Sequence, residues 1–318
     1  MSNSTVGVVK SAMPDDAIVS TRSTAVDGVA FSCVVDDDPT IAAQCYIWLN
    51  CLLRLHALPA ASIFVHAPVG YESALLRWAV AIGVNVVPIV PFDPRSPHCN
   101  KICQLDTFER GRFKRVVLMD CDTAWVGPME LPPTGSDSAI LAKVVDRPNP
   151  PEESLAKLFH AARLGEPVWV EVGPPLAGGR RKTDHNNCNG GVYILDQSVL
   201  PSLRPTWRKW ALWCLGQGEI LGRHLRNSDQ LGFVLALREM GASVTPLSIE
   251  WNYPTHLPPA ELPNVAPRIF HYHREMTSNH LLKPTGIVQP DAAILALNRQ
   301  IATFPPLCSL DAIVKEEG

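Results

Sequence analysis

The sequence predicts an α/β fold in which a mainly parallel central sheet is flanked by helices. Short apolar runs rich in β-branched residues recur along the chain, as in strands that are buried on both faces. Between residues 29 and 119 these runs alternate with helical segments, which favours right-handed, doubly wound connections. One run, residues 116–119, ends at Asp120 and Asp122, and the ligands of open α/β sheets lie at the carboxyl ends of the strands.

The first half of the chain is predicted in some detail. We expect strands at 29–35, 62–66, 84–90 and 116–119, and helices at 40–57, 72–82 and 100–110. The helix 40–57 is apolar on nearly every face and should be deeply packed. Asp36, Asp37 and Asp38 follow the first strand, where they either cap the next helix or hold the base or ribose of a ligand.

The second half is less regular. We expect strands at 139–145, 168–172, 243–248 and 268–273, and helices at 151–164, 198–215 and 231–240. Residues 173–188 are predicted to be the least structured internal stretch. They include Arg180, Arg181 and Lys182, which suit either a mobile loop over an anionic ligand or a basic surface loop. Because no linker is evident, residues 28–318 are expected to form one domain, preceded by a flexible arm at 1–27.

Glycines and tryptophans mark two further segments. Gly190 and Gly191 stand immediately before a predicted strand, so the backbone there either turns sharply or is approached closely, in a sugar site by the substrate. Trp207, Trp210 and Trp213 recur at helical spacing, a pattern more typical of a core than of a carbohydrate platform.

Composition narrows the function classes. The net charge is −3, which gives no reason to expect nucleic acid or an anionic membrane as a partner. Nine scattered cysteines without a Cys-x-x-Cys pair argue against a disulfide framework and a structural zinc site, and they fit a reducing cytosol. No stretch approaches the ~18 apolar residues of a membrane span. We therefore expect a cytoplasmic protein without a transmembrane segment.

Asp120 and Asp122 are candidate metal ligands. Because one residue separates them where a strand ends, both carboxylates can converge on one hard cation, Mg²⁺ or Mn²⁺, while Cys121 points elsewhere. The last predicted strand places His271 and His273 on one face, and either can supply a third ligand.

Two other segments carry candidate polar residues. Lys101 lies one element before the carboxylates, where it either faces a phosphate or is an ordinary exposed lysine. Ser228 is a predicted N-cap, which leaves Asp229 and Gln230 in the first turn of a helix, where they reach a ligand or complement the helix dipole.

Five motifs and a Lys-Pro pair occur in a recognisable order: VVLMDCDTAWVGP, NGGVYILD, DQLGFVLAL, WNY and IFHYH, with Lys283-Pro284 downstream. This order resembles the retaining GT-A glycosyltransferases of glycosyltransferase family 8, the glycogenin and galactosyltransferase group, over residues 29–286. The resemblance implies a GT-A, Rossmann-like fold with its Asp-x-Asp motif at a strand end. It also implies a Mn²⁺ or Mg²⁺ cofactor and a nucleotide-sugar donor, most often UDP-linked.

The resemblance also implies roles for individual residues and segments. Residues 28–128 would form a nucleotide-binding half, 129–288 an acceptor-side half, and 289–318 a C-terminal helix and tail. The matched positions are Asp120, Asp122 and His271 as metal ligands, Asn189, Gly190 and Gly191 at the sugar, Asp229 and Gln230 beside the anomeric carbon, and Lys283 at the leaving diphosphate.

The chain differs from the family pattern near its last motif. The family reads approximately His-x-x-Gly-x-x-Lys-Pro-Trp, whereas here Lys283 follows His271 by twelve positions and Thr285 replaces the tryptophan. His273 therefore remains an alternative ligand to His271. Two other functions are compatible with the same fold: a non-catalytic relative that binds a nucleotide-sugar, and a sugar nucleotidyltransferase. The latter usually carries a Gly-rich phosphate loop after the first strand, which this sequence lacks.

Overall fold

The computed structural model describes residues 27–108, 111–132, 139–176 and 179–310. The expected N-terminal arm, apart from residue 27, and the end of the expected C-terminal tail lie outside the described residues.

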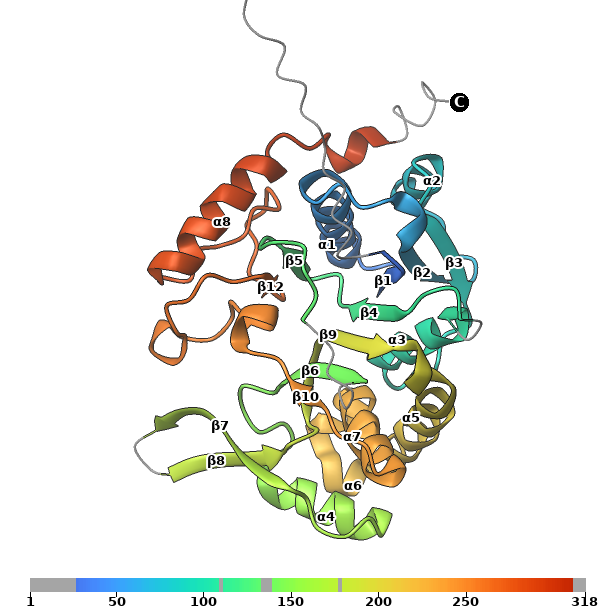
Figure 1. The fold of residues 1–318 in the computed structure, drawn as a ribbon, viewed down its shortest axis with the longest axis vertical. Coiled ribbons are helices and arrows are strands. Elements are labelled where there is room, and N and C mark those ends of the chain that lie inside the picture. Colours follow the sequence, from blue (N-terminus) through green and yellow to red (C-terminus); the bar gives the residue numbers. More distant parts are fainter. Residues whose placement is uncertain (1–26, 109–110, 133–138, 177–178, 311–318) are drawn as a thin grey trace, which may run out of the picture.

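A seven-stranded sheet forms the centre of the molecule, in the order β10-β6-β9-β4-β1-β2-β3 (Figure 1). Its strands are β1 (Val29–Val34), β2 (Ile63–Pro68), β3 (Asn85–Ile89), β4 (Arg115–Met119), β6 (Ile140–Val144), β9 (Cys188–Asp196) and β10 (Thr245–Pro246). Only β9 runs antiparallel to its neighbours, β4 and β6. The other neighbouring strands are parallel. The expected α/β fold with a mainly parallel sheet is confirmed.

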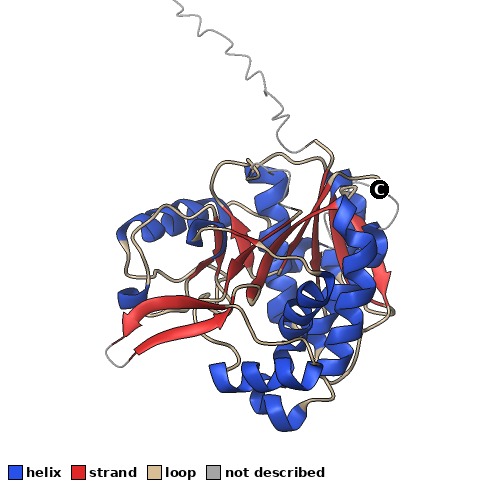
Figure 2. Cartoon of the chain, turned by 60° about the horizontal axis from the view of Figure 1, so that its bottom comes forward, coloured by secondary structure: helices blue, strands red, loops and turns tan. Residues whose placement is uncertain are grey.

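Helices cover both faces of this sheet, as Figure 2 shows. They are α1 (Pro39–Asn50), α2 (Ala74–Ala81), α3 (Asn100–Cys103), α4 (Glu152–Ala162), α5 (Leu200–Cys214), α6 (Gly218–Leu221), α7 (Ser228–Met240) and α8 (Val288–Ile301). A π-helical turn, Cys51–Leu55, extends α1, and a 3₁₀ turn, Gln104–Phe108, extends α3. Neighbouring strand residues serve opposite faces: Val117 packs with α1, α2 and α8, and Val116 packs with α3, α5 and α7.

A second, three-stranded sheet carries the segment that matters most for the site. Its order is β11 (Tyr253–Pro254), β12 (Ile269–His271) and β5 (Thr123–Trp125). Strands β12 and β5 are antiparallel, and His271 lies opposite Thr123. This pairing brings the histidines near the end of the chain beside the turn that carries Asp120 and Asp122.

Several expectations for the second half need correction. Residues 173–188 are not unstructured: β7 (Trp169–Leu176) and β8 (Gly179–Asp184) form an antiparallel hairpin that projects from the body in Figure 2. The two glycines lie inside β9, not before it. The expected strand 243–248 shrinks to β10. The N-cap of α7 is Asn227, and Ser228 begins the helix, with its hydroxyl donating to the Leu225 carbonyl.

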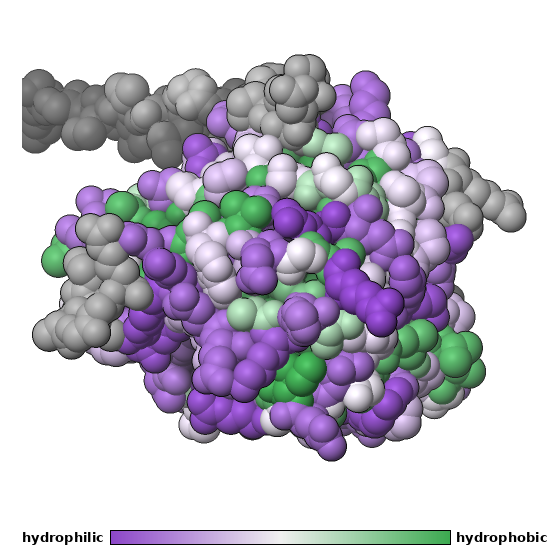
Figure 3. All heavy atoms as spheres, turned by 90° about the horizontal axis from the view of Figure 1, so that it is seen from below, coloured by the Kyte–Doolittle hydropathy of each residue, from purple (hydrophilic) through white to green (hydrophobic). Residues whose placement is uncertain are grey.

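The tryptophan pattern belongs to the core, as expected. Trp207 is fully buried and packs against Phe233 and Tyr193, and Trp210 is also buried. Seen from below, the surface is a mosaic of hydrophilic residues and small separate hydrophobic patches (Figure 3). Across the described residues, every helix is too short or too polar to span a membrane.

Candidate functional site

A cavity of about 1130 Å³ opens at the carboxyl ends of β1 and β4. Its volume is at the upper end of the range for small-molecule sites. Seven of the predicted site residues line it: Lys101, Asp120, Asp122, Asn189, Asp229, Gln230 and His271. His273, the alternative ligand, also lines it. These residues come from α3, the turn after β4, β9, α7, and β12 with the residues after it, so the fold gathers them from across the chain.

Lys101 is a buried cation at the floor of this cavity. Its Nζ lies 2.6 Å from Asp120 Oδ1 and donates to the Gly190 carbonyl oxygen at 2.6 Å. Burial alone would lower the pKa of Lys101, but the nearby carboxylates of Asp120 and Asp229 outweigh it and raise the pKa. Of the two readings of Lys101, the exposed helix lysine is therefore wrong: the side chain is a fixed positive charge beside the carboxylates.

Asp122 faces two histidines. Its Oδ1 lies 3.2 Å from His271 Nε2, and its Oδ2 lies 3.5 Å from His273 Nδ1. The three side chains form a group whose ligand atoms all lie within 4.8 Å of one another. Burial favours the neutral acid, but the interactions with His271, His273 and Lys101 prevail and lower the pKa of Asp122 to about 2. Asp122 is therefore a carboxylate, the form that binds a cation.

Both His271 and His273, the two alternative metal ligands, lie close to Asp122. Strand β12 ends at His271, and His273 follows in a left-handed backbone conformation with φ +49°. The two rings stack with centroids 3.9 Å apart, and His256 meets His273 edge to face. Burial lowers the pKa of His273 to about 3, so its ring is neutral at physiological pH and keeps a free nitrogen lone pair.

A chain of hydrogen bonds fixes which nitrogen of His271 carries its hydrogen. The Gly191 amide donates to Asn189 Oδ1, and Asn252 Nδ2 donates to the same oxygen at 3.3 Å. Asn252 Oδ1 therefore points at His271 Nδ1, 3.0 Å away, and can only accept. Nδ1 is the donor in this chain, and Nε2 is directed at Asp122.

These donors fit a divalent cation. Asp122 Oδ1 and His273 Nε2 are buried and make no hydrogen bond. With Nδ1 of His271 donating to Asn252, Nε2 is the ring nitrogen that faces Asp122 Oδ1 at 3.2 Å, so both atoms can be ligands of one cation. Asp120 Oδ2 lies 4.0 Å from His271 Nε2 and is not taken by Lys101, which leaves a further oxygen ligand on the same side. A set of carboxylate oxygens and imidazole nitrogens suits a divalent first-row transition metal ion.

Asp229 and Gln230 lie on the other side of Gly190. Asp229 is buried in the first turn of α7, and burial raises the pKa of its carboxyl. An alanine Cβ at Gly190 would lie 3.3 Å from Gln230 Nε2. Gln230 Oε1 is a buried acceptor without a hydrogen-bond partner at the cavity wall, so it is available to a bound molecule.

Of the two expectations for the glycines of β9, a sharp turn or a close approach, the close approach is confirmed. A Cβ at Gly190 would sit 2.7 Å from Lys101 Nζ, and one at Gly191 would sit 2.5 Å from His271 Nδ1. The groups that approach the backbone closely are therefore the chain's own lysine and histidine. Both glycines are required for the positions of the charged residues around Asp120 and Asp122.

Three predicted features lie apart from this centre. Lys283 does not line the cavity, and its Nζ pairs with Glu275 at 3.2 Å on the surface. Of the three acids after β1, Asp38 caps α1 by accepting from the Thr40 amide, while Asp36 lines the cavity. Arg181 and Lys182 lie on the β7–β8 hairpin and do not line the cavity. Lys182 is exposed and Arg181 is half-buried.

The sequence reasoning missed several residues that line the cavity or support the residues that line it. Asn252 was part of a motif, but its orienting hydrogen bond to His271 depends on β11 and β12 lying side by side. Arg223 and Arg226 also line the cavity. They lie in a 3₁₀ turn, Gly222–Asn227, which has no hydrophobic periodicity that would predict it. The composite RHLRNSDQ run, in which these cations precede Asp229 and Gln230, was the available signal.

Comparisons with known proteins give a consistent class. No protein-family model and no curated protein matches the sequence. Mouse xyloside xylosyltransferase 1 in its apo form is a similar solved structure, with 15% identity, a TM-score of 0.48, and coverage of 77% of this chain and 98% of that one. A second similar structure is the galactosyltransferase LgtC in complex with donor and acceptor sugar analogues. It has 13% identity and a TM-score of 0.46, and the match covers 87% of this chain and 98% of that one.

The glycosyltransferase GlyE of Streptococcus pneumoniae TIGR4 gives 12% identity, a TM-score of 0.48, and coverage of 90% of this chain and 63% of that one. These three similar structures are all glycosyltransferases, the class that the sequence motifs resemble. With identities this low and TM-scores below 0.5, the likeness carries no argument about activity, which is taken up below from the residues of the cavity.

Proposed function

We propose that this chain is a metal-dependent glycosyltransferase that moves a sugar from a nucleotide-sugar, UDP-linked, to an acceptor with retention of the anomeric configuration. One observation carries the proposal: a cation-binding group, a buried lysine and an unpaired amide oxygen converge on a single cavity. A nucleotide diphosphate leaves only when its charge is neutralised, and the first two groups supply that neutralisation.

Asp120, Asp122 and His271 would hold the divalent metal, and His273 lies close enough to join them. When bound, such a metal supplies Lewis-acid stabilisation of diphosphate oxygens. The protein's own part is to keep these donors in place. Lys101 anchors Asp120, and Asn252 orients the His271 ring, so that the ligands are arranged before the donor arrives.

The sugar would lie between this centre and the start of α7. Asn189, which lines the cavity, and the neighbouring Gly190 are proposed to contact the sugar, and the unpaired Oε1 of Gln230 can face positive charge that develops at the anomeric carbon. Asp229, buried next to it in the first turn of α7, also lines this part of the cavity. Lys283 is 48% exposed and bound to Glu275, so we assign it no part in holding the diphosphate.

A thermal-shift panel of UDP, GDP, CMP, ADP and dTDP, each with Mn²⁺ and with chelator, tests the donor site. A nucleotide at about 100 times its dissociation constant should add about 2.7 kcal/mol to the free energy of unfolding. We expect a shift with UDP that chelator removes. The absence of a chelator-sensitive shift with every nucleotide would contradict the donor site.

Product analysis then separates the remaining functions. Incubation with UDP-sugars and Mn²⁺ should release UDP, which identifies glycosyl transfer or donor hydrolysis. Release of pyrophosphate from UTP and a sugar phosphate would identify a nucleotidyltransferase instead. Tight UDP-sugar binding without any product, over a panel of acceptors, would identify the non-catalytic relative.

A further inference from the structure

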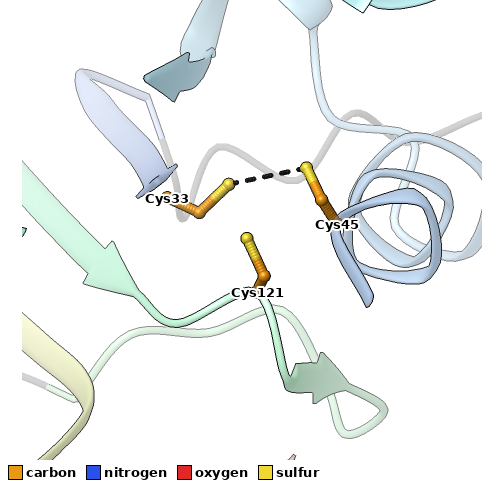
Figure 4. A group of neighbouring side chains, drawn as sticks. All are labelled: Cys33, Cys45 and Cys121. Atoms are coloured by element: carbon orange, nitrogen blue, oxygen red, sulfur yellow. Dashed lines mark hydrogen bonds between the residues drawn. The ribbon is translucent and has the colours of Figure 1, made fainter. Parts of the chain in front are cut away.

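A second cluster of donor atoms lies beneath the cavity. Cys33 is on β1, Cys45 is on α1, and Cys121 is the residue between Asp120 and Asp122. Figure 4 shows the three sulfur atoms pointing toward one another from these three elements. All three side chains are buried, and their sulfur atoms lie within 4.8 Å of one another.

Burial by itself does not explain this convergence. Eight of the nine cysteines are buried, and buried cysteines commonly pack as small apolar residues. Yet Cys33, Cys45 and Cys121 are the one all-cysteine group of three that the described part of the chain holds at this spacing. Cys51, which is equally buried and begins the π-helical turn directly after α1, belongs to no such group.

The sulfur separations match those around a metal. Zinc–thiolate bonds are about 2.3 Å long, so tetrahedral geometry places ligand sulfurs about 3.8 Å apart. Cys33 Sγ and Cys45 Sγ are 3.9 Å apart. Cys121 Sγ now donates to the Val34 carbonyl at 2.9 Å, and a rotation toward the other two sulfurs exchanges that hydrogen bond for a metal bond.

The donor set selects a soft divalent ion. Thiolates bind Zn²⁺ and Cu⁺ and disfavour Mn²⁺ and Mg²⁺, which prefer oxygen. Three thiolates leave a net charge of −1 with a divalent ion and −2 with a monovalent one. Because Asp120 and Asp122 flank Cys121, the smaller residual charge is favoured. Three sulfurs leave one position of a tetrahedral ion for a further ligand, such as water.

We propose that Cys33, Cys45 and Cys121 form a binding site for one thiophilic divalent metal ion such as Zn²⁺. This site is separate from the oxygen and imidazole donors of the cavity. Binding transfers three thiol protons to solvent and joins β1, α1 and the turn after β4 through one ion. The turn that carries Asp120 and Asp122 is then anchored from below.

The test uses Cd²⁺, which gives an ultraviolet thiolate-to-metal absorption band that Zn²⁺ lacks. Reduced full-length protein is stripped with chelator, supplied with excess Mg²⁺ to occupy oxygen donors, and titrated with Cd²⁺. We expect a band that saturates at one ion per chain and that Zn²⁺ displaces. Cys45→Ala should lose this band, while the matched control Cys51→Ala should keep it.

Three outcomes would overturn the proposal. The wild type alone decides the first: no saturable thiolate band at one equivalent. The second is a band of unchanged affinity in folded Cys45→Ala, which would place Cd²⁺ at other thiols, such as exposed Cys308. The third is an equal loss in Cys51→Ala. If Cys45→Ala does not fold, Cys33→Ala provides the same comparison.

Discussion

The turn after β4 presents opposite chemistry to its two sides. Toward the cavity, Asp120 and Asp122 meet a lysine and two histidines through oxygen and nitrogen atoms. Toward the core, Cys121 meets Cys33 and Cys45 through sulfur. Three consecutive residues of this turn therefore face a polar site and a core at once. The comparison teaches that substitutions one residue apart should separate function from stability.

The largest effect is expected on the cavity side. Asp122→Ala should reduce Mn²⁺-dependent donor cleavage by about 10³-fold or more, because several kcal/mol of charge stabilisation are lost with the ion. The fold should stay intact, with the free energy of unfolding lower by no more than about 2 kcal/mol, the amount that corresponds to the lowered pKa of Asp122. Initial rates and urea unfolding measure the two effects. A well-folded variant that kept its Mn²⁺-dependent cleavage would refute the metal assignment.

Asn252 should matter through His271 and not through contact with substrate. Asn252→Ala is expected to weaken Mn²⁺ binding by about 10- to 100-fold, as for other groups that orient a metal ligand. Electron paramagnetic resonance of free Mn²⁺ measures this without turnover. Asn252→Asp should recover much of the affinity, because its carboxylate accepts the same Nδ1 hydrogen.

The matched control for Asn252 is Asn50→Ala, which removes an equally buried amide on α1 whose Nδ2 donates to the Tyr46 carbonyl. Its Mn²⁺ affinity should equal that of the wild type. Equal losses in the two variants would reduce Asn252 to a structural role.

Acid should destabilise the core side through His66. This ring lies on β2, bonded to Ser32 and Thr107 and packed on Phe108, and burial lowers its pKa to about 4. Because the unfolded value is about 6.5, the unfolded chain binds the proton first, and stability falls as pH drops from about 6.5 toward 4. The His66 contribution between pH 7 and pH 5 is about 2 kcal/mol, or about 30-fold in the folding equilibrium.

Urea unfolding of the wild type and His66→Gln at both pH values isolates this contribution. The variant should be less stable than the wild type at pH 7, because its buried hydrogen bonds change. Between pH 7 and pH 5, however, it should lose about 2 kcal/mol less free energy of unfolding than the wild type loses. An unchanged pH dependence would assign the acid sensitivity to other histidines.

The smallest effect on catalysis is expected from the core-side counterpart. Cys33→Ala removes one sulfur from a fully buried position that does not line the cavity. Unfolding free energy measured without added Zn²⁺ should fall by about 1 kcal/mol, as for a small cavity. Donor cleavage under the same conditions should stay within about twofold of the wild type. A loss as large as that of Asp122→Ala would show that the two sides of the turn are not separable.

Prediction from sequence succeeded for segments whose hydrophobic pattern directly reports how they are buried. Strands β1, β2, β3 and β4 lie between helices and read as short apolar runs, so their alternation was visible. The strand expected at 168–172 corresponds to the start of β7, but β8 was missed, because it pairs only with β7 in a projecting hairpin and its Arg181 and Lys182 give no apolar pattern. The two residues of β10 are too few to carry a pattern.

Asp120 and Asp122 were accessible to sequence reasoning because they are local: a buried strand, its end and two carboxylates stand within a few residues. Local pattern likewise determined the α/β class and the placement of the tryptophans in the core. Tertiary structure alone decided that His271 and His273 both face Asp122, that Gly190 makes room for Lys101, and that three distant cysteines meet. Periodicity reports which face of an element is buried, whereas the partner on that face depends on packing between elements far apart in the chain.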